Sequence, residues 1–165
     1  MPITTTYHND FIVDAAKKKL HQVTFTLVPA DWKAYPSTIT LKWKLVAFDE
    51  KNHSKIPKKS GVYTFVIVPG VARHPRNSLP IYVGEAKDLN NRYKNYLDDR
   101  TNAKARPLVK AMFALWYDYL VYCYAEIDDS SLVHGVQDDL IRALSPVINS
   151  MYPKDVQATV TAAAL

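Results

Sequence analysis

The sequence predicts an α+β fold in which helices flank a small sheet of three strands. Three observations predict it: two strand-like runs close together at residues 61–68 and 81–84, a third at residues 117–127, and helix-like patterns between and after them. The order over residues 61–149 is therefore strand, strand, helix, helix, strand, helix. A chain of 165 residues favours one domain over two.

The three strands differ in pattern. Gly61–Val68 is nearly all apolar after Thr64, which predicts a central strand buried on both faces. Val71–Pro80 is expected to be a long hairpin arm, and Ile81–Gly84 is the strand that pairs with Gly61–Val68. Tyr117–Ile127 is a third strand, rich in tyrosine.

Three helices are expected around this sheet. Asp88 is placed to cap a helix that runs through Leu97, and Ala103–Leu115 is a second helix with Pro107 in its first turn or as a break. The last helix starts after Ser130 or Ser131 and ends at Pro146. Its apolar face consists of Leu132, Val133, Val136, Leu140, Ile141 and Leu144.

The chain is divided into an N-terminal extension at residues 1–60, a core at residues 61–154 and a C-terminal tail at residues 155–165. The extension is predicted to hold one helix at residues 10–20, two strands and the polar loop Asp49–Ser60. The strands are His21–Val28 and Thr38–Phe48, the latter with Ile39, Leu41, Trp43 and Leu45 on one face. The tail is either a weak helix or frayed.

Composition limits the class of protein. No run of eighteen apolar residues exists, so no membrane partner is expected, and the N-terminus lacks the basic-then-apolar pattern of a signal peptide. The single cysteine, Cys123, cannot form an internal disulfide and is expected to be buried. These features fit a reducing cytoplasm, which is the expected location.

Positive charge is clustered along the chain, whose net charge is +5. Lys17–Lys19 form one cluster, residues 51–60 carry four lysines and no acid, and residues 85–110 carry seven basic and four acidic residues. Solvated surface is the alternative interpretation of each cluster alone. Together they favour a polyanionic partner.

Tyrosines and one arginine are spaced so that they can meet. Gly61-Val62-Tyr63 and Tyr82-Val83-Gly84 put two phenols on neighbouring strands, and Arg92 and Tyr96, four residues apart, share a face of the next helix. Arginine binds a phosphate with a planar fork, and a phenol can orient water without losing its proton. The group indicates a phosphodiester site. A structural or protein-interaction domain, with the tyrosines only in its core, is the alternative.

These motifs, with the run Leu140–Asn149, resemble the GIY-YIG nuclease family, in particular the incision domain of bacterial excision-repair proteins and restriction-type members. The resemblance covers residues 61–149. It implies a metal-dependent DNA endonuclease that acts on double-stranded DNA with one divalent metal, Mg²⁺ or Mn²⁺. The length of the chain favours a restriction-like or mobile-element role. Residues 1–60 would add DNA recognition or dimer contacts, and a homodimer is an open option because one active site cannot cut both strands.

The resemblance also implies roles for single residues. Tyr63 would be the base or the water-orienting phenol, assisted by Tyr82; Arg92 would bind the scissile phosphate, Tyr96 would contact the phosphate or the nucleophile, and Asn149 would brace the site. The interval from Tyr63 to Tyr82 is longer than is usual in the family, which predicts an insertion at residues 71–80. The basic residues expected to bind DNA are Lys87, Lys94, Arg73, Arg76, Lys104 and Arg106.

One departure bears on catalysis. The family's metal-binding glutamate lies twelve residues before the asparagine, where this chain has the uncharged Gln137. Magnesium prefers anionic oxygen ligands, so a loss of roughly a thousandfold in rate is expected.

Three explanations of Gln137 stay open. In the first, which we favour, it is an engineered substitution that keeps the shape of the site and blocks cutting. In the second, it is natural and the protein is a catalytically inactive nucleic-acid-binding protein of the same fold. In the third, Asp138 or Asp139 supplies the carboxylate. Helix geometry argues against the third, because neighbouring side chains project about 100° apart.

Overall fold

The computed structural model describes residues 39–70, 78–102, 104–150 and 153. The predicted helix at residues 10–20, the strand His21–Val28, residues 71–77 of the hairpin arm and the tail at 155–165 lie outside the described residues. The described elements are β1 (Lys44–Ala47), the 3-10 helix η1 (Glu50–Lys55), β2 (Gly61–Ile67), β3 (Leu79–Ala86), α3 (Leu89–Asp99), α4 (Pro107–Trp116), the 3-10 helix η3 (Tyr117–Tyr119), β4 (Leu120–Glu126) and α5 (Val133–Leu144).

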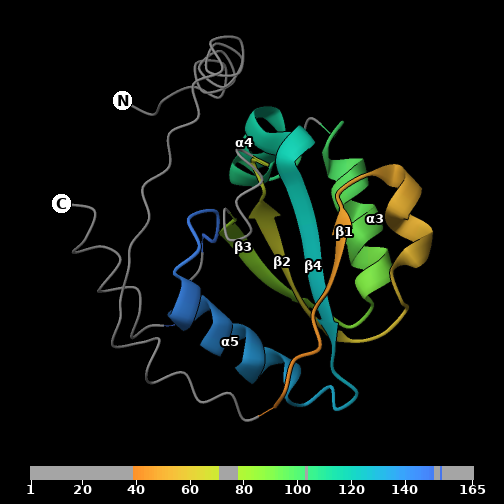
Figure 1. Cartoon of the computed structure of the whole chain (residues 1–165), viewed down its shortest axis with the longest axis vertical. Coiled ribbons are helices and arrows are strands. Elements are labelled where there is room, and N and C mark those ends of the chain that lie inside the picture. The colour runs from red at the N-terminus through yellow and green to blue at the C-terminus, as the bar shows by residue number, and fades with distance from the viewer. Residues whose placement is uncertain (1–38, 71–77, 103, 151–152, 154–165) are drawn as a thin grey trace, which may run out of the picture.

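The strands form one antiparallel sheet in the order β1-β4-β2-β3, with helices on both faces (Figure 1). The predicted α+β class is confirmed, and so is the central, buried position of β2. The described sheet has four strands rather than three, because β1 pairs with the free edge of β4. Residues 44–47 of the predicted N-terminal extension are therefore part of the same sheet as the core.

Alternation along the strands gives the sheet two different apolar faces. On one face, aromatic side chains such as Tyr63, Phe65 and Tyr122 pack under α3 and α4. On the other, the smaller side chains of Val62 and Val83 pack under α5. Figure 1 shows α5 apart from α3 and α4. The fold thus separates an aromatic core from an aliphatic one.

The four apolar side chains expected on one face of the second extension strand differ in burial. Ile39 and Leu41 pack on the α5-side cluster, but Trp43 and Leu45 are 37% and 64% exposed. Leu45 is paired with Cys123 at the edge of the sheet, whereas α5 packs mainly against β3 and β2, so nothing in the described chain covers Leu45. The buried residues at this end of the strand are instead Phe48 and, in part, Val46.

The polar segment predicted as a loop contains η1, which is tied to α3. Asp49 caps η1 by accepting from the Lys51 amide at 2.9 Å. Asn90 of α3 donates through Nδ2 to the carbonyl oxygens of His53 and Ile56, at 3.0 and 2.9 Å. These bonds hold the segment before β2 against the helix that carries Arg92.

Helix ends differ from expectation in detail. α4 begins at Pro107, whose missing N–H costs nothing in a first turn, and η3 delays the start of β4 to Leu120. Leu132, not a serine, occupies the N-cap of α5, because Ser131 bonds instead to Asp129. α5 ends before Pro146, as predicted, with Ser145 in the left-handed region at φ 42°.

None of the helices in the described residues has the length and apolarity that crossing a bilayer would require.

Candidate functional site

The pairing of β2 with β3 brings the predicted phenols to one face. Tyr63 is opposite Gly84 and Phe65 is opposite Tyr82. A side chain at Gly84 would run into the ring and hydroxyl of Tyr63, and one at Gly61 would run into the carbonyl oxygen of Ala125. Both glycines of the two motifs are therefore needed for close packing, one for the Tyr63 ring and the other for the approach of β4.

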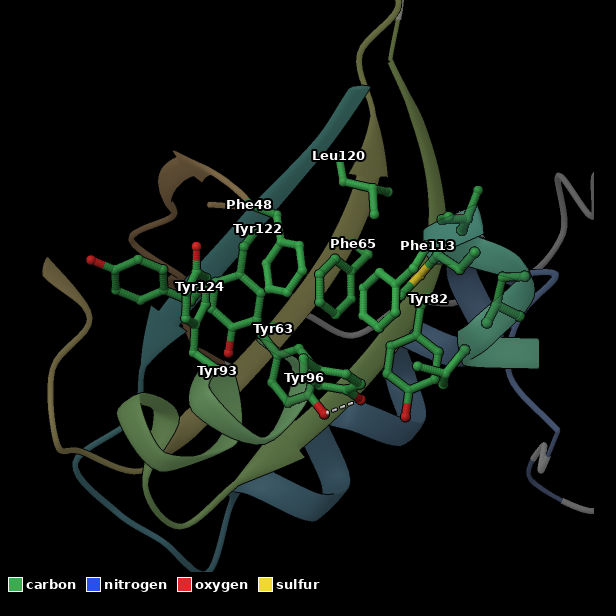
Figure 2. Packing of buried hydrophobic residues seen from close by; sticks show 14 of the residues in the cluster. Phe48, Tyr63, Phe65, Tyr82, Tyr93, Tyr96, Phe113, Leu120, Tyr122 and Tyr124 are labelled. Atoms are coloured by element: carbon green, nitrogen blue, oxygen red, sulfur yellow. Dashed lines mark hydrogen bonds between the residues drawn. The ribbon is translucent and has the colours of Figure 1, made fainter. Parts of the chain in front are cut away.

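α3 adds a third phenol to this group. The hydroxyls of Tyr63 and Tyr96 lie 3.0 Å apart, and the ring of Tyr82 lies with its centroid 6.2 Å from that of Tyr63 and 6.1 Å from that of Tyr96. Figure 2 shows the three hydroxyls on the same side of the ring cluster. We call these three residues the phenol cluster. The tyrosines meet as predicted, but among the described residues no hydrogen bond joins Arg92, which was expected to meet them, to any of the three hydroxyls.

Arg106, expected only as a DNA contact, belongs to the phenol cluster's immediate surroundings. Its Nη1 donates to the Tyr82 hydroxyl at 3.4 Å and its Nη2 to the Tyr96 hydroxyl at 3.2 Å. Its guanidinium carbon also lies 5.9 and 5.8 Å from the centroids of these rings. The sequence carries no signal for this contact, since Arg106 is ten residues from Tyr96 and outside the motifs.

Burial keeps the inner phenols neutral. It raises the pKa of the Tyr63 hydroxyl well above its usual value, and the bond to Tyr96 adds to the increase. Burial also raises the pKa of Tyr96, although the bond from Tyr63 and the charge of Arg106 work against that increase. Tyr63 is only 2% exposed. Of the two roles left open for Tyr63, a neutral, orienting phenol therefore agrees better with this environment than a base.

The larger of two neighbouring hollows lies where α3 and α5 begin and β3 ends, and it is not lined by any member of the phenol cluster. Its volume is about 960 Å³. Among the described residues, no carboxylate pairs with Lys58, Lys87 or Arg92, so their charges are available to an anion. The lining residues used below are Lys58, Lys87, Arg92, Asn95, Val133 and His134.

The amides at the start of α3 are already bonded. The Leu89 amide donates to the Lys59 carbonyl at 2.9 Å, the Asn90 amide to the Pro57 carbonyl at 3.1 Å, and the Asn91 amide to the Asp88 carboxylate at 2.9 Å. Helix amides that bind anions must be free to point at them. An anion in this hollow would therefore be held by side chains.

A smaller hollow of about 380 Å³ adjoins the larger one and shares Arg92 and Asn95 with it. Lys104 and Arg106 contribute two more positive charges, and Asp98 and Asp99 contribute two negative ones. Because Arg92 belongs to both hollows, a phosphate bound by it would lie at their junction.

Gln137 lies on α5, on the other side of the sheet from the phenol cluster, and is partly buried. It follows Val133 by four residues and His134 by three, and both of these line the larger hollow. Residues at these spacings share a face of a helix, so Gln137 lies next to that hollow rather than among the phenols.

The residues near Gln137 do not fit a magnesium ion. Magnesium needs hard, anionic oxygen ligands, and Gln137 supplies only an amide. The carboxylates nearby are engaged: Glu85 lies 3.4 Å from His134 Nδ1, Asp138 lies 3.9 Å from His134 Nε2, and Asp139 pairs with Arg142 at 3.2 Å. The described chain contains no group of three His, Cys, Asp or Glu side chains placed to hold a metal.

Asn149 bonds to the backbone of β3 rather than to the phenols. Its Oδ1 accepts from the Val83 amide at 2.9 Å and its Nδ2 donates to the Val83 carbonyl at 2.8 Å. β3 is an edge strand of the described sheet, so Asn149 satisfies groups that would otherwise lack partners. The bonds fix the residue between Tyr82 and Gly84.

The remaining predicted residues divide into three groups. Lys87 and Lys104 line the larger and the smaller hollow respectively, while Lys94 is exposed on α3 and lines neither. Arg73 and Arg76 lie outside the described residues. Sequence reasoning missed Asn95, which lines both hollows, and the contact of His134 with Glu85. Asn95 lies three residues after Arg92 on α3, which is the one signal that could have identified it.

No family model matches the chain, and no curated protein matches it. Solved structures similar to it include the magnesium-bound GIY-YIG N-terminal endonuclease domain of UvrC from Thermotoga maritima, with a TM-score of 0.44 and 24% identity over 60% of this chain and 92% of that chain. An asparagine-to-alanine variant of that domain matches with a TM-score of 0.43 and 23% identity over 61% of this chain and 93% of that chain. A tyrosine-to-phenylalanine variant matches with a TM-score of 0.42 and 23% identity over 62% of this chain and 99% of that chain. The chain is thus similar in structure to a GIY-YIG endonuclease domain.

Proposed function

We propose that this protein is a GIY-YIG-type DNA endonuclease whose phosphodiester hydrolysis is weakened by Gln137. The substrate is double-stranded DNA, bound across the two hollows. The observation that carries the proposal is Arg92: it lies at the junction of both hollows, on the same helix as Tyr96, and shares the larger hollow with Lys58 and Lys87, which pair with no carboxylate of the described residues.

Arg92 is the residue that binds the phosphate undergoing attack. Its guanidinium offers two parallel N–H donors to two phosphate oxygens and keeps its charge when partly buried. As the phosphate gains negative charge in the transition state, a fixed cation at this point stabilises the transition state more than the ground state. Lys58 and Lys87 attract the flanking backbone of the DNA.

The phenol cluster sets the geometry beside Arg92. Tyr63 stays protonated because it is buried, and it holds Tyr96 in place through the 3.0 Å bond between their hydroxyls. Tyr82, at 9% exposure, is the least buried of the three and is the phenol that reaches an attacking water. Its role is to orient that water rather than to take its proton.

Gln137 limits the rate. A divalent metal, Mg²⁺ or Mn²⁺, would supply charge next to the phosphate, and the neutral amide does not hold it. The substitution Gln137→Glu restores an anionic oxygen of the same length at the edge of the larger hollow.

The test is nicking of supercoiled plasmid by the present chain, by Gln137→Glu and by Gln137→Met, each with Mg²⁺, with Mn²⁺ and with a chelator. The expected result is metal-dependent nicking by Gln137→Glu at a rate at least about a hundredfold above the present chain, with Gln137→Met no faster than the present chain. Gln137→Met has a similar size and no ligand oxygen, so it separates charge from shape. Inertness of Gln137→Glu on supercoiled, linear and branched DNA would contradict the endonuclease assignment.

A second candidate is a non-cutting DNA-binding protein that uses the same hollows. The observation that favours it is the lack, in the described chain, of a carboxylate group free to hold a metal near Gln137. It predicts salt-sensitive DNA binding and no cleavage by Gln137→Glu. The plasmid assay, run together with a binding assay, therefore separates the two candidates.

A further inference from the structure

We propose that Arg106 is a positioning residue of the site: its guanidinium, held at the start of α4, fixes the hydroxyls of Tyr82 and Tyr96 in one arrangement. The inference rests on the proposed function for its consequence in catalysis. Its structural part, the clamp on two phenols, stands on the geometry alone.

The first support is the two-pronged contact. Separate nitrogens of the guanidinium reach separate phenols, Nη1 to Tyr82 at 3.4 Å and Nη2 to Tyr96 at 3.2 Å. The two tyrosines come from β3 and α3, and Arg106 is the N-cap residue of α4. One side chain therefore links three elements. A planar guanidinium can bridge two hydroxyls in this way, whereas the single ammonium of a lysine has no fixed fork.

The second support is the chain of contacts behind the clamp. The hydroxyls of Tyr96 and Tyr63 are bonded at 3.0 Å, so a contact that holds Tyr96 in place also restricts Tyr63. Phenol hydroxyls rotate freely unless a donor or acceptor fixes them, and the Tyr82 hydroxyl has two such neighbours, Arg106 and Tyr96. Arg106 is the one charged donor of these two, and it bonds to both hydroxyls at once, so it restricts where the Tyr82 hydroxyl points.

The third support is charge. The guanidinium lies over the faces of both rings, a favourable cation–π position, and it acts to lower the pKa of Tyr96 against the effect of burial. Burial acts to lower the pKa of Arg106. The hydrogen bond from Arg106 to Tyr82 and the attraction of the guanidinium to both phenols act in the opposite direction and are larger, so the pKa of Arg106 is raised. The cation and the phenols stabilise each other.

A matched control lies two residues away. Lys104 lines the same smaller hollow and carries the same charge, and among the described residues it has no bond to a phenol. Removing either charge weakens attraction of DNA in a similar way. Only the loss of Arg106 releases the two hydroxyls, so the comparison of Arg106→Met with Lys104→Met separates positioning from simple electrostatics.

The experiment labels the full chain with 3-fluorotyrosine and records fluorine NMR spectra, with Tyr82→Phe and Tyr96→Phe used to assign the two resonances. Arg106→Met is expected to shift both resonances, Arg106→Lys to shift at least one, and Lys104→Met to leave both in place. Circular dichroism of each variant checks that the fold is kept. This readout needs no activity, so it decides on the clamp even if the protein does not cut DNA.

The kinetic arm uses the Gln137→Glu background. Arg106→Met is expected to lower kcat by roughly tenfold to a hundredfold, the scale that misplacing a positioned group produces, while KM changes no more than in Lys104→Met. Unmoved fluorine resonances in Arg106→Met would overturn the clamp. Shifted resonances with an unchanged kcat would overturn the positioning role. Inertness of the Gln137→Glu parent itself would count against the proposed function and not against the clamp.

Discussion

Buried phenols are the unusual residues of this protein. Tyr63, Tyr93, Tyr96 and Tyr122 are each at most 2% exposed, and all four have a raised pKa, with burial as the largest cause. Tyr93 is also bonded in both directions, accepting from the Asp49 amide and donating to the Asp49 carbonyl, each at 2.9 Å. The neutral phenol is the form that the folded state favours.

The raised pKa values predict loss of stability at alkaline pH. Burial raises the pKa of Tyr93 to about 12, whereas an unfolded chain ionises its tyrosines near pH ~10. A raised folded pKa gives stability that is complete below about pH 10 and is lost as pH rises towards 12, because the unfolded state loses its protons first. Urea unfolding between pH 9 and 12 is expected to show a free energy of unfolding that falls as pH rises. The slope of that free energy against pH should correspond to a difference of more than one bound proton between the folded and unfolded states.

Lysines such as Lys44 and Lys59 also have raised pKa values, so they too lower the free energy of unfolding as pH rises. Comparing Tyr93→Phe with Tyr119→Phe separates the contribution of the buried phenol from that of the lysines. Tyr119 is 48% exposed, so its loss is expected to leave the slope unchanged, whereas Tyr93→Phe should make it shallower. Equal slopes in Tyr93→Phe and the parent chain would mean that the Tyr93 phenol ionises as readily in the folded state as in the unfolded state.

At the scale of elements, β3 is held from both sides. β2 bonds to its inner edge and the side chain of Asn149 to its outer edge, with a further bond from the Ile148 amide to the Ile81 carbonyl at 2.9 Å. The segment after α5 therefore fixes the strand that carries Tyr82.

Asn149→Ala is expected to lower the free energy of unfolding by about 2–3 kcal/mol, because it leaves the amide and carbonyl of Val83 without their side-chain partners. Thermal or urea unfolding measures it. Asn95→Ala is the control, since Asn95 is exposed on α3 and should change stability by less than about 0.5 kcal/mol. A loss no greater for Asn149→Ala than for Asn95→Ala would show that these bonds do not brace the strand.

Elements with strong local patterns were predictable from sequence, and contacts between distant segments were not. The apolar run Gly61–Val68 indicated the buried centre of the sheet, and Asp88 indicated the start of α3. Alternation identified a strand before Phe48, but it could not show that β1 pairs with β4 or that α5 leaves Leu45 uncovered. Both depend on where other elements pack.

The same limit applies to the candidate site. Motif spacing anticipated that Tyr63, Tyr82 and Tyr96 meet, because strand pairing and one helix turn are local rules. The contact of Arg106 with two phenols depends on how α4 docks, and the hollow between Arg92 and His134 depends on the packing of α3 and α5 across the sheet.

For the whole molecule, we propose that the junction of the two hollows binds a DNA phosphate through Arg92. Arg100, at the C-terminal end of the same helix and with the same charge, is a matched control for Arg92. Its guanidinium donates to the Tyr117 hydroxyl and lies over that ring, and it lines neither hollow.

The most direct measurement is the affinity of the chain, of Arg92→Ala and of Arg100→Ala for a labelled duplex over a series of salt concentrations. We expect that affinity falls with salt, that Arg92→Ala weakens binding about tenfold and reduces the salt slope by about one, and that Arg100→Ala changes neither appreciably. Binding by Arg92→Ala that is as tight and as salt-dependent as that of the parent chain would contradict it.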